Sequence, residues 1–194
     1  MSVIVAVKEK GVVYMGADTQ TTAGKKKYSG LNETAFKVVR LKNGMLVGFC
    51  GKVAAKHTIL SSSDDYFTLN EQGGLDKKHI VNHIIPKLEN KMDLIGDKEY
   101  WRLDVSILLA YKDKLYKITD DLKVISVNEF IATGSGADYA FYVLSEMQDL
   151  SVRDRILKAL TESANRTEAV GGPYALIDTE NLEYEIVDMG EENY

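Results

Sequence analysis

The chain has 194 residues, a net charge of −5 at pH 7 and a hydrophobic content of 45%. This length is enough for one full-sized core, and we expect a single domain over residues 1–194. The acidic balance argues against a nucleic-acid partner or an anionic membrane surface, because clustered cations drive such binding. The single cysteine, Cys50, cannot form a bridge within the chain, which favours a reducing compartment. No apolar run is long enough to span a membrane and no basic leader precedes the first strand, so we expect a soluble cytoplasmic protein.

The first half of the chain predicts two β-hairpins followed by two helices. Its opening run, Val3–Val7, is apolar without alternation, which is typical of a strand buried on both faces. Residues 9–11 form the first expected turn, and the Asn43-Gly44 pair is the strongest turn signal in the chain. In chain order the expected elements are strands over 3–7, 12–17, 36–41 and 45–50, and helices over 53–70 and 76–94.

The second half of the chain predicts the same plan in reverse, with strands first and a helix pair after them. Two helices begin at sequences that look like capping boxes, with Ser135 and Ser151 as the candidate caps. The expected elements are strands over 105–111, 114–119 and 129–133, helices over 136–148 and 152–167, and closing strands over 174–179 and 184–188.

This order of elements predicts an α+β fold. Antiparallel hairpins separated by two helix pairs suit a four-layer αββα sandwich, in which two antiparallel sheets stack between helix pairs. The central strands would then be covered on both sides, which explains the unbroken apolar run at the N-terminus.

Ser2 is the residue of most chemical interest. Methionine aminopeptidases remove Met1 when the second side chain is small, so we expect Ser2 to become the N-terminal residue. Its free α-amine would have a pKa near ~8 and could act as general base for the hydroxyl of the same residue. A start codon followed by a small residue explains the same two letters, so this signal is weak when taken alone.

Strand pairing places a carboxylate near Ser2. If residues 9–11 form a three-residue turn, Lys8 pairs with Val12 and Ser2 lies opposite Asp18. Directly opposed residues on neighbouring strands approach within ~5 Å. Asp18 also suits an Asx turn at the end of the strand, and both interpretations stay open.

Five segments of the chain resemble proteasome β subunits, most of all the HslV-like peptidases, within the N-terminal nucleophile hydrolase superfamily. The motifs are short, and their specificity lies in their combination and order along nearly the whole chain. The segments are Ser2–Gly11, Gly16–Gly24, Phe36–Leu41, Val47–Gly51 and Ala132–Gly136.

The resemblance implies roles for three residues at the reaction centre. Ser2 stands where the family has its N-terminal threonine nucleophile. Asp18 matches the acidic residue after the second strand, and Lys37 matches a lysine whose ammonium favours the deprotonated nucleophile. A solvated lysine at a strand edge would explain Lys37 equally well from its sequence context.

Three further residues are implied around this centre. The backbone N–H of Gly48 matches the family's oxyanion donor and would also bind the substrate, although a tight turn explains this glycine too. Ser135 matches a serine near the amine of the nucleophile, and its role as a helix N-cap is equally open. Thr22 matches a substrate-binding residue whose backbone pairs with the substrate as a β-strand does.

The chain departs from the family pattern at several positions. Serine in place of threonine lacks the methyl that fixes the rotamer of the nucleophile. Thr167 and Val170 replace an aspartate and a serine near the amine, and Glu168 lies one residue away from the expected acid. A retained Met1 would block the amine and give an inactive protein.

The resemblance implies a serine- or threonine-type endopeptidase that cleaves unfolded polypeptides inside a homo-oligomeric ring. That ring would be hexameric or heptameric and doubled, and an ATP-dependent unfoldase would feed it. Two alternatives stay open: a structural subunit that assembles without cleaving, and an amidase of the same fold that acts on a small molecule.

The sequence predicts no metal or other cofactor. His79 and His83 share a helix face at i, i+4, but no glutamate follows His79 and no third ligand is evident. The Gly134-Ser135-Gly136 run lacks the third glycine and the downstream acid of a dinucleotide site. Cys50 lies in an apolar strand, and we expect it to be a core residue.

Overall fold

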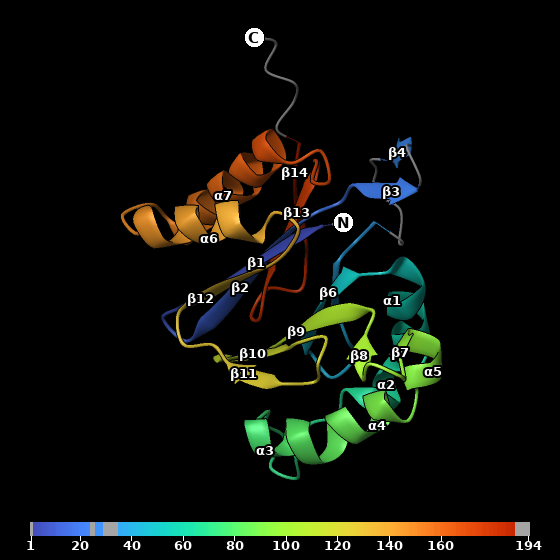
Figure 1. The fold of residues 1–194 in the computed structure, drawn as a ribbon. Coiled ribbons are helices and arrows are strands. Elements are labelled where there is room, and N and C mark those ends of the chain that lie inside the picture. The colour runs from blue at the N-terminus through green and yellow to red at the C-terminus, as the bar shows by residue number, and fades with distance from the viewer. Residues whose placement is uncertain (1, 24–25, 29–34, 189–194) are drawn as a thin grey trace.

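A computed structural model describes residues 2–23, 26–28 and 35–188 of the chain. Within this part, two five-stranded antiparallel sheets lie face to face between two layers of helices (Figure 1). The α+β architecture and the four-layer arrangement expected from the sequence are therefore confirmed.

The first sheet contains the N-terminal strand as an inner strand. Its strands, in spatial order, are β12 (Phe130–Gly134), β1 (Val3–Glu9), β2 (Val12–Asp18), β13 (Tyr174–Asp178) and β14 (Glu185–Val187). Because β1 pairs with β12 on one side and with β2 on the other, Ser2, directly before β1, is held at the end of the sheet.

The second sheet supplies the facing layer of the sandwich. Its strands, in spatial order, are β11 (Val124–Ser126), β10 (Lys114–Ile118), β9 (Val105–Tyr111), β6 (Leu46–Gly51) and β5 (Val38–Arg40). Two short hairpins lie outside both sheets, and the sequence patterns did not predict them: β3 (Thr21–Ala23) with β4 (Lys26–Tyr28), and β7 (Gly96–Asp97) with β8 (Arg102–Leu103).

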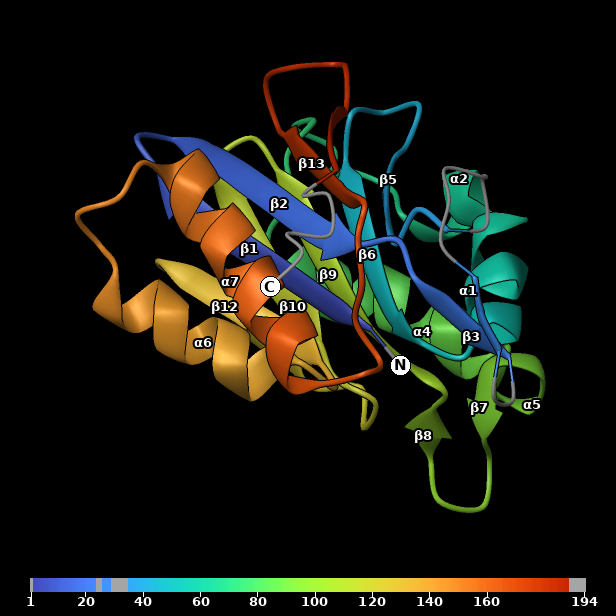
Figure 2. The same cartoon turned by 90° about the horizontal axis from the view of Figure 1, so that it is seen from above.

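Helices α6 (Ala137–Glu146) and α7 (Val152–Arg166) cover the sheet that contains β1, and α1 (Val53–Leu60) lies on the opposite side of the molecule (Figure 2). The Ser151 hydroxyl accepts from the Asp154 N–H at 3.1 Å, which confirms the predicted cap of α7.

The other helix pair is more broken than the sequence predicted. The expected helix over 53–70 ends as α1 at Leu60, and the Ser61 hydroxyl donates to the Thr58 carbonyl. The expected helix over 76–94 contains a π-helical segment just before Pro86, a residue that has no N–H to continue α-helical bonding. The observed segments are α2 (Ser63–Tyr66), α3 (Lys77–His79), η1 (Ile80–Ile84), α4 (Ile85–Glu89) and α5 (Met92–Ile95).

The unbroken apolar run of β1 serves two different cores. Val3, Val5 and Val7 pack with α6 and α7, whereas Ile4 and Ala6 pack in the layer between the two sheets. Alternate side chains of a strand point to opposite faces, so a strand covered on both faces needs apolar side chains at successive positions. The predicted two-sided burial of β1 is confirmed.

The predicted three-residue turn of the first hairpin is wrong. The strands end at Glu9 and resume at Val12, so the turn contains only Lys10 and Gly11, at φ 49° and 85°. Positive φ at both central residues is what a two-residue hairpin turn of type I′ requires. The register is therefore one residue away from the expected one, which changes how Asp18 reaches the N-terminus.

Candidate active site

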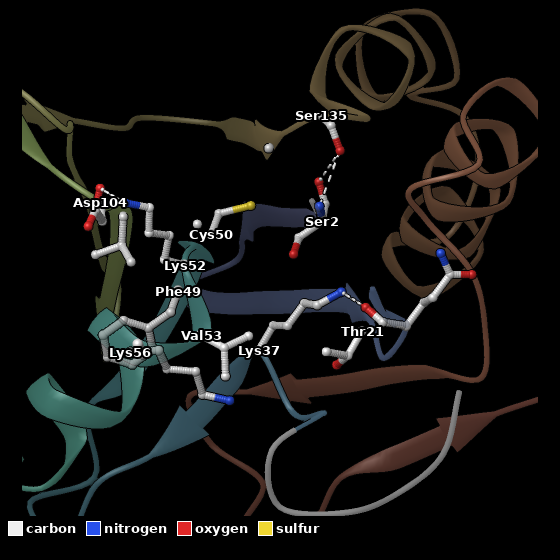
Figure 3. A pocket seen from close by; sticks show the side chains of 15 residues that line it. Ser2, Thr21, Lys37, Phe49, Cys50, Lys52, Val53, Lys56, Asp104 and Ser135 are labelled. Carbon is white, nitrogen blue, oxygen red and sulfur yellow. Dashed lines mark hydrogen bonds and ion pairs between the residues drawn. The ribbon is translucent and has the colours of Figure 1, made fainter. Parts of the chain in front are cut away.

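Ser2 lies directly before β1, is 5% exposed, and lines a pocket of about 840 Å³. The pocket lies where β6 ends and α1 begins, and Asp104 and Val105, at the start of β9, form part of its wall. Figure 3 shows the side chains that surround Ser2. The lining residues are Ser2, Gln20, Thr21, Lys37, Phe49, Cys50, Gly51, Lys52, Val53, Ala54, Lys56, Asp104, Val105, Gly134 and Ser135.

Asp18 and Lys37 form a buried ion pair next to Ser2. The Lys37 ammonium donates to Asp18 Oδ2 at 2.5 Å and to the Gln20 carbonyl at 2.8 Å. The other oxygen of Asp18 accepts from the Val3 N–H at 2.8 Å. Asp18 thus reaches the N-terminal segment through Val3, not by lying opposite Ser2 as the expected register required.

Burial sets the proton affinities of this pair. Loss of hydration lowers the pKa of Lys37 and raises the pKa of Asp18, while their mutual attraction acts against both shifts. In Figure 3 the Lys37 ammonium lies on the side of the pocket where Ser2 lies. A lysine whose pKa is lowered in this way is suited to exchange a proton with a neighbouring hydroxyl. It can also stabilise the negative charge that develops on the oxygen when that hydroxyl loses its proton.

A second lysine in the wall of the pocket is also strongly affected by burial. Lys56 is 4% exposed, and burial together with the charge of Lys37 lowers the pKa of Lys56 to about 8. Its ammonium donates to the Phe36 carbonyl, which ties α1 to the segment leading into β5. The pocket therefore combines cationic groups with the apolar side chains of Phe49 and Val53.

Ser135 contacts the backbone of Ser2. Its hydroxyl oxygen lies 3.2 Å from the Ser2 nitrogen, from which it accepts, and 3.2 Å from the Ser2 carbonyl oxygen, to which it donates. The N-cap residue of α6 is Gly136, and no side chain caps the helix there. Of the two interpretations open for Ser135, the structure supports the contact with Ser2, and the N-cap interpretation is wrong.

Gly134 allows the chain to pass close to Ser2. Its φ is +108°, and a Cβ atom there would collide with the Ser2 carbonyl oxygen and with the Cys50 sulfur. Only glycine adopts this conformation and leaves this space.

The structure does not bring Gly48 to the pocket. Gly48 lies in the middle of β6, paired with Val38 on one side and Leu108 on the other. A Cβ there would face Met15 and Ile4, at 3.0 and 3.3 Å, in the layer between the sheets. Gly48 thus allows the two sheets to approach closely, and its expected position beside the nucleophile is wrong.

Gly51, which was not predicted from the sequence, is the glycine of β6 that lines the pocket. The Phe49 N–H donates to the Lys37 carbonyl at 2.7 Å, toward β5. Backbone groups alternate in direction along a strand, so the Gly51 N–H points the same way, beyond the first residue of β5. At Gly51 φ is +151°, and a Cβ would collide with the Asp104 carbonyl oxygen. The available signal was a glycine at the junction of a strand and a helix.

Two expected features lie at or beyond the edge of what the structure describes. Thr22 belongs to β3, paired with Lys27 of β4, and its neighbour Thr21 lines the pocket. Met1, on which the state of the amine depends, lies outside the described residues.

The sequence model of the family described as Proteasome subunit matches residues 2–175. This chain belongs to the proteasome subunit family. Its fold is similar to that of BPH from Thiobacillus denitrificans, with a TM-score of 0.72 and 18% identity over 91% of this chain and 96% of that one. BPH has also been solved in complex with epoxomicin, and that structure matches with the same TM-score of 0.72.

Two further solved structures share the fold of this proteasome-family chain. HslV from Trypanosoma brucei matches with a TM-score of 0.68 and 17% identity, over 91% of this chain and 98% of that one. A Gly-1 mutant of Anbu from Hyphomicrobium sp. strain MC1 matches with a TM-score of 0.72 and 14% identity, over 99% and 89% of the two chains. At these identities the likeness is one of fold.

In this proteasome-family chain, Val170 is a core residue and Thr167 forms a hydrogen bond within its own turn. Val170 is 4% exposed and packs in the core beneath α6 and α7. The Thr167 hydroxyl accepts from the Ala169 N–H at 3.3 Å, within its own turn. The apolar side chain of Val170 has no proton donor or acceptor.

The described residues of this proteasome-family chain contain no group of three or more His, Cys, Asp or Glu side chains that could hold a metal ion. His79 and His83 stack at 4.7 Å, and His79 Nε2 lies 2.9 Å from the Thr68 carbonyl oxygen. Over the same residues, no helix has the length and apolar character that crossing a membrane requires.

Gly134→Ala is expected to destabilise the fold far more than Gly73→Ala. Both glycines have positive φ, but nothing lies within 4 Å of a Cβ at Gly73. Gly73→Ala therefore pays only the backbone strain, about 1–2 kcal/mol, whereas Gly134→Ala adds a collision with Ser2 and Cys50. Thermal unfolding of the two variants checks this, and equal losses would contradict the close approach at Gly134.

Proposed function

We propose that this proteasome-family chain is a peptidase that hydrolyses peptide bonds of unfolded polypeptides through Ser2, after removal of Met1. The observation that carries the proposal is the buried Lys37–Asp18 pair beside Ser2 at the edge of a large pocket. An ion pair in a core costs desolvation and is often no more stable than apolar packing, so a chemical role accounts for its presence better than stability does.

The proposed reaction begins with the Ser2 hydroxyl and the α-amine of the same residue. The oxygen attacks the carbonyl carbon of the scissile peptide bond, and its proton passes to the amine, aided by the charge of Lys37. The tetrahedral intermediate collapses to an ester at Ser2 as the leaving amine takes up the proton. Water then attacks the ester, with the α-amine again acting as base, and releases the second product.

Two backbone elements would hold the substrate during this reaction. The N–H of Gly51, directed past the start of β5, is our candidate donor to the developing oxyanion, in the role the sequence analysis gave to Gly48. The backbone of Thr22 in β3 would pair with the substrate as an added strand. Ser135, already in contact with the Ser2 nitrogen, would orient the amine.

The proposed setting is a closed homo-oligomeric ring, hexameric or heptameric and doubled, in the cytoplasm. Family membership supports this assembly, because sequestering such sites inside a chamber restricts them to unfolded chains. An ATP-dependent unfoldase would supply those chains.

A specific observation favours a second candidate function, a subunit that assembles without cleaving. Val170 places an apolar side chain where the family commonly has a serine near the amine, and Thr167 engages its own turn. If the amine of Ser2 lacks hydrogen-bonding partners at these two positions, the fold would persist while catalysis is lost. An amidase of the same fold acting on a small molecule would need no chamber, so a monomer or dimer would favour it.

Activity is expected to depend on removal of Met1. An amide nitrogen cannot accept a proton near neutral pH, so an internal Ser2 lacks its base, an effect of roughly 10² to 10⁴ in rate. One sample carries a cleavable ubiquitin directly before Ser2, and a second carries an extension that cannot be removed. Only the first should hydrolyse unstructured fluorogenic peptides and gain one epoxyketone adduct by intact mass. Equal activity in both samples would exclude Ser2 as an N-terminal nucleophile.

Replacing Lys37 by methionine is expected to lower the turnover of a fluorogenic peptide by on the order of 10² to 10³. The change keeps the aliphatic stem and removes the cation that biases the hydroxyl toward deprotonation. It also leaves Asp18 buried without its partner, so the Lys37→Met, Asp18→Asn double variant is measured beside it to separate folding from catalysis. Lys42→Ala is the matched control, since Lys42 pairs with Asp64 on the surface. Normal turnover in folded Lys37→Met would remove Lys37 from the mechanism.

The assembly is expected to be a ring of six or seven chains, or two such rings. Native mass spectrometry and analytical ultracentrifugation at micromolar concentrations measure this directly. A monodisperse monomer would contradict the closed chamber, and the small-molecule amidase would then be the better explanation of the pocket.

A further inference from the structure

Cys50 lines the pocket next to Ser2, and the proposed reaction gives it no role. It lies in β6, is 8% exposed, and its sulfur lies 3.6 Å from the Thr133 carbonyl oxygen, to which the thiol donates. The Ser2 side chain is within hydrogen-bonding contact of the same sulfur. Figure 3 shows the sulfur of Cys50 directed at Ser2.

The thiol is unsuited to act as a nucleophile here. Burial raises the pKa of Cys50 to about 11, despite the nearby charge of Lys37, so the group stays protonated at neutral pH. A protonated thiol is a bulky, polarisable group that donates and accepts hydrogen bonds weakly. Its effect on Ser2 must therefore be through packing and orientation.

Orientation is what a serine nucleophile lacks. A threonine has two heavy atoms on Cβ, which restrict χ1, whereas a serine hydroxyl can occupy any of three staggered positions. Only a position that faces Lys37 and the pocket is useful for attack. A neighbouring group that blocks or disfavours the other positions would supply the missing restraint.

The sulfur is itself firmly held. A Cβ at Gly134 would collide with both the Cys50 sulfur and the Ser2 carbonyl oxygen, so these three residues are in close contact. The thiol is also tied to Thr133 on the same strand, β12. Cys50 therefore cannot turn aside without disturbing the strand that contacts Ser2.

We propose that Cys50 is a positioning residue that holds the Ser2 hydroxyl toward Lys37, taking over the restraint that a γ-methyl supplies in a threonine nucleophile. The inference rests on the proposed function of Ser2. It also predicts that Cys50 matters when residue 2 is serine and not when it is threonine.

A double-mutant cycle tests this directly. Four proteins are compared, each released from ubiquitin so that residue 2 is N-terminal: the parent, Ser2→Thr, Cys50→Ala and the double variant. In the serine background Cys50→Ala is expected to lower kcat about tenfold with KM within about twofold, since misorientation of a reacting group affects the chemical step. In the threonine background the same substitution should lower kcat by less than about twofold, because the γ-methyl of threonine already restricts χ1. It could even raise kcat, because removal of the thiol makes room for that γ-methyl.

The controls separate orientation from general damage to the core. Val127→Ala leaves a void in the same layer between the sheets, away from the pocket, and should leave kcat unchanged. Thermal unfolding is measured for every variant, and if Cys50→Ala does not fold, Cys50→Ser replaces it in the cycle under the same criterion. An equal loss of kcat in both backgrounds would overturn the role of Cys50 and leave the peptidase intact. A parent protein without Ser2-dependent hydrolysis would overturn the proposed function and this inference together.

Discussion

The ion pair between Lys37 and Asp18 is the interaction on which the rest of the site depends. Asp18 ends β2 in one sheet and Lys37 leads into β5 in the other, so the pair forms only when the two sheets are stacked. Its desolvation is offset by further bonds to the Val3 N–H and the Gln20 carbonyl. The same contacts that satisfy the buried charges therefore place the first residues of β1 against a lysine. Folding of the sandwich and assembly of the site are one event.

The layers could be predicted from the sequence for three reasons. The unbroken apolar run of β1 indicates burial on two faces, Asn43-Gly44 is a strong turn signal, and the capping box at Ser151 marks the start of α7. The register of the first hairpin could not. A glycine at position 11 suits a two-residue and a three-residue turn equally, and the choice depends on Lys10 adopting positive φ, which a lysine rarely does. The prediction that Asp18 lies near Ser2 nevertheless tolerates this error of one residue. The Asp18 carboxylate accepts from the N–H of Val3, the residue next to Ser2.

The site was predicted less completely than the fold, and the two glycines of β6 show why. Gly48 and Gly51 differ by three positions, so their N–H groups point to opposite edges of the strand. Motif similarity selected the one that packs between the sheets, and only the pairing of Phe49 with Lys37 identifies the one that faces the pocket. The contact of Ser135 with Ser2 was reached only through the resemblance, and the contact of Cys50 was not predicted at all. Their contacts with Ser2 join segments far apart in sequence, and no local pattern reports on such contacts.

The pairing of β1 on both sides has a consequence for how such a protein would be switched on. The ladder with β12 begins at Val3, opposite Gly134, so the peptide bond before Ser2 lies outside it. Cleavage of that bond breaks no pairing between β1 and β12 and requires no change in the packing of the sheets and helices. A precursor and its mature form would then share one shape and differ only in a single nitrogen, amide in the first and amine in the second. Under the proposed function, latency would be chemical, and its release would require no rearrangement of the fold.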